Sequence, residues 1–324
     1  MSKKSVFSIL YALFKAVRPR QWVKNASLYA ALLFSGFLFY QPLTGPSYFL
    51  IVTWAAILFS ILASSVYLIN DIVDAKADRN HPFKKNRPIA SGALPVPVAL
   101  LASMLGLAFV LIASLKLQPF FLVLVILYVL MQIFYAKYLK HIPILDVVTI
   151  STGFLIRVYA GAIVVNLHMS VWFLLTIISA SLFLSVAKRQ SELTLLNNTA
   201  PHLLGTTRKI LSRYSQRLLD QYTSMFATAT WLSYALFAFQ SQNFQSTNPK
   251  FTNIYTVLPR SFHTEKLLML SLPFVIYGVM RYLHLIYEKN RGESPERVLY
   301  SDKPIFVDAT LFVLVVFLVI YVLG

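Results

Sequence analysis

Apolar residues form long segments along this chain, with few of the alternating polar positions that mark a soluble protein. A helix needs roughly 20 consecutive apolar residues, with a lower limit of about 17, to cross the hydrocarbon core of a bilayer. The pattern predicts an all-α integral membrane protein with nine transmembrane helices. Their predicted limits are 25–42, 47–69, 95–115, 119–138, 144–165, 169–187, 218–239, 267–286 and 305–323.

No polar linker separates these segments, so we predict a single domain over residues 1–324. Residues 1–24 precede the first predicted span and carry a shorter apolar run, Val6 to Val17, which Lys15 interrupts. The run is too short to span and lacks the small residues of a cleavage site. It predicts an interfacial amphipathic helix and not a signal peptide.

Positive charge is distributed unevenly between the two sides that these spans define. With the amino terminus inside, 24 of the 29 Lys and Arg residues fall in inner segments, four fall in outer segments, and Arg157 lies within a span. Cytoplasmic loops of membrane proteins carry an excess of Lys and Arg. The bias predicts a multi-pass protein of the cytoplasmic membrane with its amino terminus inside and its carboxyl terminus outside.

Composition excludes several kinds of site. The chain has no cysteine, which rules out disulfides, thiolate metal sites and a cysteine nucleophile. Its six histidines are scattered, so we predict no zinc site. The net charge of +17 is largely explained by topology, and a nucleic-acid partner is therefore not required.

Acidic residues are rare, yet three of the twelve fall within eight positions at the inner end of the second predicted span. Asn70, Asp74 and Asp78 are four residues apart and would line one helix face, with Tyr67 and Asp71 beside it. Carboxylates at this spacing repel one another unless a cation joins them. Mg²⁺ binds one or two carboxylates together with substrate phosphates, which predicts a magnesium site with Mn²⁺ as a substitute. The alternative is a solvated helix end.

A basic loop follows at once and includes Lys84, Lys85 and Arg87. A metal ion held by carboxylates on one side, with Lys or Arg on the other, would bind a diphosphate. The alternative is that the loop only sets the topology, as any inner loop of this charge would.

The acidic motif, read as NDxxDxxxD, and the RPxxxG stretch after it resemble the UbiA superfamily of intramembrane prenyltransferases. Nine spans and an inner amino terminus are also that superfamily's architecture. The resemblance covers nearly the whole chain and implies a central cavity open to the cytoplasm. It implies roles in catalysis for Asn70, Asp74 and Asp78, and in metal binding for these three and Asp71.

A narrower resemblance rests on the segments RPRQWVKN, at 18–25, and HPFKKNRPIASG, at 81–92. Both are similar to the decaprenyl-phosphate phosphoribosyltransferase branch, which joins 5-phosphoribosyl diphosphate to a polyprenyl phosphate. Aromatic prenyltransferases of the superfamily carry a second Asp-rich motif after the sixth span. Here that place holds Lys188, Arg189 and Glu192, which suits substrates with additional phosphates. The alternative is an ordinary ion pair at a helix end.

Two further positions attract attention. Arg157 is a charge at membrane depth, which costs about 2.5 kcal/mol or more and marks a functional candidate; the alternative is a structural partner of a buried polar group. The segment from Tyr135 through Lys137 to Lys140 resembles the family's element near the diphosphate, although an aromatic belt with snorkelling lysines would look similar. The predicted substrate-binding residues are Lys24, Tyr67, Lys84, Arg87, Lys137, Lys140, Arg157, Lys188 and Arg189.

The resemblance thus implies a Mg²⁺-dependent enzyme that transfers 5-phosphoribose to a decaprenyl-type polyprenyl phosphate and releases diphosphate. It is also compatible with a homo-oligomer such as a trimer. Two alternatives stay open: a UbiA-type transfer of a prenyl group to an aromatic or glyceryl-phosphate acceptor, and a membrane transporter or lipid scaffold. The missing second Asp-rich motif disfavours the first, and the lack of an internal repeat disfavours the second.

Overall fold

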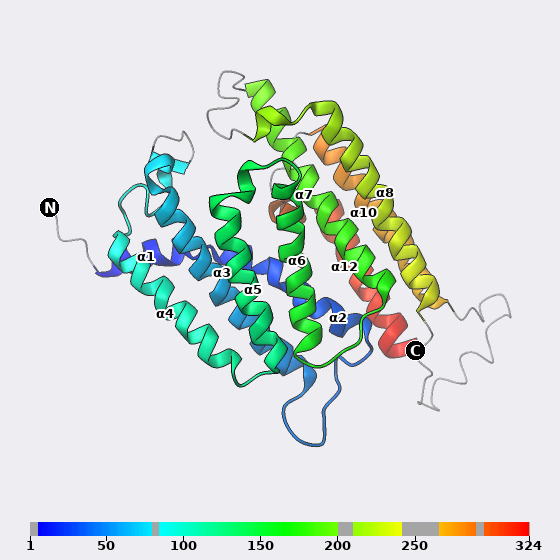
Figure 1. Cartoon of the computed structure of the whole chain (residues 1–324). Helices are drawn as coiled ribbons and strands as arrows, with labels where there is room; N and C mark the ends of the chain where they lie inside the picture. Colours follow the sequence, from blue (N-terminus) through cyan, green and yellow to red (C-terminus); the bar gives the residue numbers. More distant parts are fainter. Residues whose placement is uncertain (1–5, 80–83, 200–209, 242–265, 290–294, 324) are drawn as a thin grey trace, which may run out of the picture. The chain divides into compact units, whose positions relative to one another are not determined.

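The computed structural model describes residues 6–79, 84–199, 210–241, 266–289 and 295–323. Within these ranges every regular element is helical and no strand occurs, which confirms the predicted all-α class (Figure 1). The α-helices are α1 (Val6–Ala16), α2 (Tyr29–Phe34), α3 (Tyr48–Arg79), α4 (Val96–Ser114), α5 (Pro119–Lys137), α6 (Leu145–Ile163), α7 (Val171–Thr199), α8 (Gln216–Gln240), α10 (Leu272–Tyr287), α11 (Pro295–Ser301) and α12 (Lys303–Phe317).

Shorter elements join or extend these helices. Five 3₁₀ segments are η1 (Pro19–Leu28), η2 (Lys84–Asn86), η3 (Leu139–His141), η5 (Leu211–Arg213) and η7 (Leu267–Ser271), and a π-helical end, η8 (Leu318–Leu323), continues α12. Prolines stand at the starts of α4, α5, α10 and α12, where the missing N–H breaks no internal hydrogen bond.

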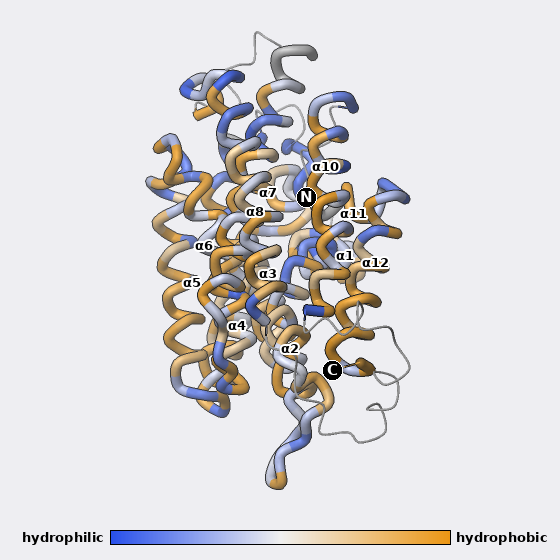
Figure 2. The backbone as a smooth tube through the Cα atoms, turned by 90° about the vertical axis from the view of Figure 1, so that its right-hand side faces the viewer, coloured by the Kyte–Doolittle hydropathy of each residue, from blue (hydrophilic) through white to orange (hydrophobic). Residues whose placement is uncertain are grey.

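Seven helical segments of the described chain are long and apolar enough to cross a membrane. Figure 2 shows hydrophobic residues along most of α5 and α12. The predicted span 218–239 corresponds to α8, which is 25 residues long but is not among the seven. Over the predicted span 25–42 the structure instead has the end of η1 and α2, a helix of six residues. The count of nine therefore stays a prediction.

The reason for the short α2 lies in the residues that flank it. Ser35 and Gly36 follow its last turn, and Gly36 adopts φ +78°, a left-handed conformation that ends a helix. The apolar run 25–42 thus contains a helix stop that its hydropathy alone does not reveal.

The chain forms two compact units. The first comprises Met1–Ala30, Tyr40–Ile142 and Ile156–Leu167, and the second comprises Ala31–Phe39, Pro143–Leu155 and His168–Gly324. Helix α6 contributes to both, its first half to the second unit and its second half to the first. The prediction of one domain stays a prediction.

The core of the first unit includes the inner face of α1. Ala12 and Ala16 are buried against Leu68 and Ala75 of α3, and the same cluster takes in Ile89 from the loop that follows α3. These small side chains let α1 approach α3 closely. The helix predicted within residues 1–24 is therefore present as α1 and is packed on the helix that carries the acidic motif, and its interfacial position stays a prediction.

Two other contacts fix the ends of the helices in their units. In the first unit α6 packs directly on η1, because Gly161 lies against the backbone of Leu28. In the second unit Phe34 of α2 packs against the rings of Phe173, Phe237 and Phe312, with centroid separations of 5.4–6.4 Å. The aromatic contacts give the short α2 a fixed place that six helical residues alone would not have.

The close approach at Gly161 predicts a strong effect for a single added methyl group. In Gly161→Ala the new Cβ would overlap the carbonyl oxygen of Leu28, and backbone must move. We expect a loss of about 1–3 kcal/mol, measured as a lower thermal midpoint in detergent. Gly106→Ala is the matched control, since its Cβ would overlap the hydroxyl of Ser65, which can rotate away, and would make ordinary contacts with Ile61 and the Cβ of Ser65. Equal midpoints for the two variants would contradict the proposed packing of α6 on η1.

Candidate active site

The acidic motif lies on the carboxyl-terminal turns of α3. This helix has 32 residues, about a dozen more than a span requires, and the additional turns carry Asn70 to Arg79. Placed beyond an apolar span, these carboxylates can reach water or a polar partner. The predicted helical spacing of the motif is therefore present in the structure.

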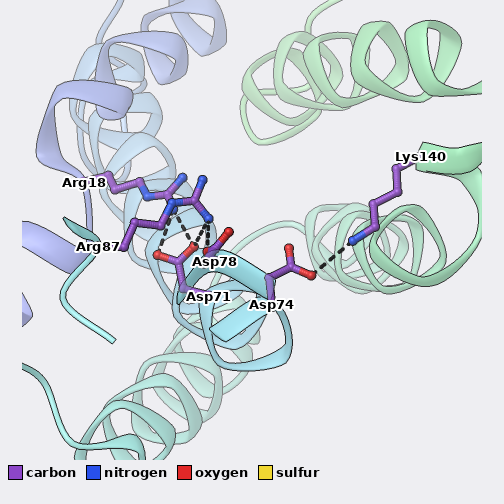
Figure 3. A network of polar contacts seen from close by, with 6 residues as sticks. All are labelled: Arg18, Asp71, Asp74, Asp78, Arg87 and Lys140. Carbon is purple, nitrogen blue, oxygen red and sulfur yellow. Dashed lines mark hydrogen bonds and ion pairs between the residues drawn. The ribbon is translucent and has the colours of Figure 1, made fainter. Parts of the chain in front are cut away.

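Asp71 and Asp78 are buried and paired with arginines (Figure 3). The Arg18 guanidinium donates to both oxygens of Asp71, at 2.5 and 2.8 Å. One nitrogen of Arg87 lies 3.1 Å from Asp71 and 2.6 Å from Asp78, so it bridges the two carboxylates. Buried carboxylates are costly unless paired, and two arginines satisfy both. We call Arg18, Asp71, Asp78 and Arg87 the arginine clamp.

Residues 84–94, which follow α3, fold into turns that position Arg87. The backbone amide of Arg87 donates to the carbonyl oxygen of Lys84, which closes one turn of 3₁₀ helix, and the Leu94 amide donates to the carbonyl oxygen of Pro88. Gly92 closes the turn with φ +73°, which a residue with a side chain rarely adopts. The RPxxxG stretch is thus a folded turn, and it positions Arg87 in the clamp.

Asp74 points away from the clamp and toward α5 and the segment after it (Figure 3). Its side chain is 38% exposed, and one oxygen lies 3.2 Å from Nζ of Lys140. Among the described residues, nothing bonds the other oxygen of Asp74 or the side chain of Asn70, which is four residues earlier on the same face. These two side chains therefore offer oxygen atoms to a ligand.

The arrangement fits a magnesium ion held by few protein ligands. Within the described ranges no three His, Asp or Glu side chains gather as a metal site. Mg²⁺ typically takes one or two carboxylates and completes its octahedron with water and substrate phosphates. Asn70 and Asp74 could supply two oxygens, whereas Asp71 and Asp78 are held by arginines and would have to leave them to coordinate a metal.

Arg157 is buried in the second half of α6 and has polar partners in the first unit. Its Nε donates to Asn25 at 2.9 Å, and a terminal nitrogen donates to the hydroxyl of Tyr128 at 2.8 Å. Asn25 in turn donates to Ser60 of α3 at 2.8 Å. Arg157 thus ties α6, η1, α5 and α3 together, which matches the structural alternative and leaves phosphate binding a prediction.

Arg189 lies in the second unit and is completely buried. Its Nε lies 2.7 Å from Asp146 of α6, and another nitrogen lies 2.7 Å from Glu192. The predicted phosphate ligand is therefore paired with two carboxylates, which also explains how a guanidinium is tolerated in the protein interior. Lys188 beside it is half-buried.

Tyr214 completes this second network. Its hydroxyl donates to Asp146 at 2.7 Å and accepts from the Ile144 amide at 2.6 Å. Ile144 adopts φ +70°, a strained conformation for a β-branched residue, and the bond to Tyr214 helps to hold it there. Burial raises the pKa of Tyr214 above its ordinary value, so the hydroxyl stays protonated and keeps donating to Asp146.

The other predicted substrate ligands occupy the first unit. Tyr67 of α3 is half-buried, and the Arg18 guanidinium lies 5.0 Å from its ring centroid. Lys24 and Lys84 are half-buried, and Lys137 is exposed at the end of α5. Asp74 and Lys140 are brought together, and Arg87 joins Asp71 and Asp78, so part of the predicted set forms two polar groups at the end of α3.

Sequence patterns alone missed several residues of these networks. Arg18 belongs to the quoted RPRQWVKN segment, but nothing in its spacing indicates a bond to Asp71, 53 residues later. Tyr128 sits in a largely apolar span, Asn25 ends the quoted segment without any signal of its bond to Arg157, and Tyr214 carries no motif of its own. The one available signal was the charge balance, since each of the few buried acids requires a cation.

Comparison with known proteins gives this geometry a family. Residues 27–301 match the UbiA prenyltransferase family. The chain is 33% identical over 318 residues to the decaprenyl-phosphate phosphoribosyltransferase of Corynebacterium glutamicum, covering 96% of this chain and 87% of the relative. It is 38% identical over 237 residues to the enzyme of that name from Mycolicibacterium smegmatis, covering 72% of this chain and 71% of the relative.

Solved structures show the same fold. A UbiA homologue from Archaeoglobus fulgidus bound to GPP and Mg²⁺ matches with a TM-score of 0.67, covering 96% of this chain and 100% of the homologue at 16% identity. The same homologue bound to DMAPP and Mg²⁺ matches with a TM-score of 0.66. Family match, relatives and fold agree, and this multi-pass membrane protein belongs to the UbiA prenyltransferase family.

Proposed function

We propose that this enzyme transfers 5-phosphoribose from 5-phosphoribosyl 1-diphosphate to a decaprenyl-type polyprenyl phosphate and releases diphosphate. The observation that carries the proposal is the end of α3, where Asn70 and Asp74 offer oxygens beside Lys140 and the arginine clamp. Relatives that are 33–38% identical and named for this reaction support the choice of substrates. The proposal extends their reaction to this chain.

The residues at the end of α3 would have different roles in metal binding, phosphate binding and positioning. A Mg²⁺ ion, or Mn²⁺ in its place, would neutralise the diphosphate as it leaves C1 of the sugar. Asn70 and Asp74 would hold that ion, and Lys140 would bind a phosphate oxygen while remaining close to Asp74. Asp71 and Asp78 act through Arg87, which both carboxylates orient. Asp78, expected from the family motif as a catalytic residue, is thus proposed here to position Arg87.

The bond changes need no additional catalyst. The bond from C1 to the diphosphate oxygen breaks, the ribosyl carbon gains oxocarbenium character, and an oxygen of the lipid phosphate bonds to C1. That oxygen is already anionic, so it needs no general base. The proposed phosphate ligands are Lys24, Tyr67, Lys84, Arg87, Lys137, Lys140, Arg157, Lys188 and Arg189, with Arg189 available only after exchange of its carboxylate partners.

A competition in detergent separates this function from a prenyl transfer. Purified protein is given labelled phosphoribosyl diphosphate with a polyprenyl phosphate, and separately a polyprenyl diphosphate with 4-hydroxybenzoate. Labelled phosphoribosyl lipid and free diphosphate in the first reaction alone support the proposal. Product only in the second reaction would assign the chain to aromatic prenyl transfer, and no product in either would favour a transporter or scaffold.

Asp74→Asn should weaken the metal site while the fold survives. Loss of one carboxylate charge is expected to weaken Mn²⁺ binding about tenfold or more, measured by electron paramagnetic resonance without substrate. Activity should fall in parallel, and excess EDTA should remove it in the parent enzyme. Lys85→Gln, an exposed charge in the neighbouring loop, is the control. Unchanged Mn²⁺ binding in Asp74→Asn would place the metal elsewhere.

Arg157→Ala should lose far more activity than Lys289→Ala, since Arg157 is buried and Lys289 is exposed. Each hydrogen bond to a charged group contributes about 1.5–3 kcal/mol, so we expect a loss of roughly 10- to 100-fold or more. Arg157→Lys keeps the charge but cannot reach Asn25 and Tyr128 together. Near-normal rates in Arg157→Ala, with the protein folded, would remove Arg157 from the proposed site.

The charge bias predicts that the site faces the cytoplasm, in the inner membrane of a bacterial cell. Because the chain has no cysteine, a single cysteine introduced at Asn86 or at Lys250 reports its own side. An impermeant maleimide applied to intact cells should label position 250 and leave position 86 unlabelled. Labelling of both from one side would refute an inner loop after α3 and an outer loop after α8. A homo-oligomer likewise stays a prediction.

A further inference from the structure

Helix α1 presents an apolar face that no part of the described chain covers. Phe7, Leu10, Tyr11 and Phe14 lie at spacings of three and four residues and are 79%, 58%, 65% and 62% exposed. The opposite face, with Ala12 and Ala16, is buried against α3. Helix α1 lies crosswise to α3 in Figure 1, so its exposed face does not extend the span.

The positive charge around this apolar face indicates the kind of surface that it contacts. The first 70 residues contain six Lys and Arg and no Asp or Glu. Lys15, on α1, and Arg20, just after it, are exposed. An apolar stripe flanked by cations matches the boundary between acyl chains and anionic headgroups, where each basic side chain strengthens binding about fivefold.

The segment that follows α1 forms hydrogen bonds with α3, from Ser64 to the acidic motif at Asp71. The hydroxyl of Ser64 donates to the Val17 carbonyl and accepts from the Trp22 indole, both at 3.0 Å. Arg18, between them, adopts φ +56° before a proline, a conformation that an arginine rarely takes. Its side chain makes the paired contact with Asp71 described above.

We propose that α1 is an interfacial strap: its outer face inserts among anionic lipid headgroups, and Arg18 then holds Asp71 so that Asn70 and Asp74 keep their orientation. Arg18 is thus a positioning residue that acts through the turns of α3. The inference deepens the proposed function, because it makes the metal and donor site dependent on the charge of the surrounding lipid.

The strap is tested by hydrogen exchange of residues 67–79, in nanodiscs of phosphatidylcholine alone or mixed with phosphatidylglycerol. Arg18→Gln should accelerate exchange there about tenfold, since a charged group loses its hydrogen bonds. Lys116→Gln, an exposed cation after α4 that is not part of the strap, should match the parent protein. Acceleration in both, or in neither, would overturn the role of Arg18. If Arg18→Gln accelerates exchange throughout the chain, Arg18→Lys, which keeps the charge, replaces it.

The lipid contact is tested by removing the outer face alone. Phe7→Ser/Phe14→Ser should accelerate exchange of residues 67–79 about fivefold, and the parent in neutral lipid should shift the same way. Leu105→Ser/Ile112→Ser, at positions 62% and 65% exposed on α4, should change nothing. Parent-like exchange in the α1 variant, or no effect of lipid charge, would overturn the strap.

Enzyme kinetics provide a second measurement. In Phe7→Ser/Phe14→Ser, KM for the sugar donor is expected to rise while kcat stays constant. Hydrogen exchange needs neither substrate nor metal, so the strap and the proposed reaction can fail independently. A failed transfer assay with the expected exchange pattern would retain the strap, and the reverse would retain the reaction.

Discussion

The pairing of buried carboxylates with cations is the interaction on which both polar networks depend. Asp71 and Asp78 in the first unit, and Asp146 in the second, are almost inaccessible to solvent, and each is bonded to an arginine. An unpaired charge in such a place would cost several kcal/mol, so the elements that carry the partners must come together for the chain to fold. The N-terminal segment and the loop after α3 are positioned for this reason.

This requirement divides the acids of the motif into two that are paired with arginines inside the protein and one that is available to a ligand. Asp71 and Asp78 are neutralised inside the protein, whereas Asp74 is partly exposed and pairs with Lys140 through one oxygen. A motif that looks like one row of metal ligands is therefore two functional groups on different sides of the helix. The same logic applies to Arg189, whose charge is already balanced by Asp146 and Glu192.

Unusual backbone conformations and one close backbone contact help to hold these ion pairs in place. Arg18 and Ile144 are held in left-handed conformations at the two places where a buried carboxylate receives its partner. Strain of this kind persists only where surrounding contacts over-determine the backbone. The contact of Gly161 with Leu28 adds a third fixed point, so the polar groups of the first unit are positioned by packing as well as by charge.

The sequence alone determined the all-α membrane class, the helical face that joins Asn70 to Asp74, the presence of a helix within residues 1–24 and the family resemblance, because hydropathy, helical period and motif spacing are local properties. Only the tertiary structure decided that Arg18 reaches Asp71, that Arg157 bonds Asn25 and Tyr128, and that Arg189 is buried between two acids. It also decided that the apolar run 25–42 contains a helix of only six residues. These outcomes rest on partners up to 132 residues away, and no local pattern specifies which cation will neutralise which acid.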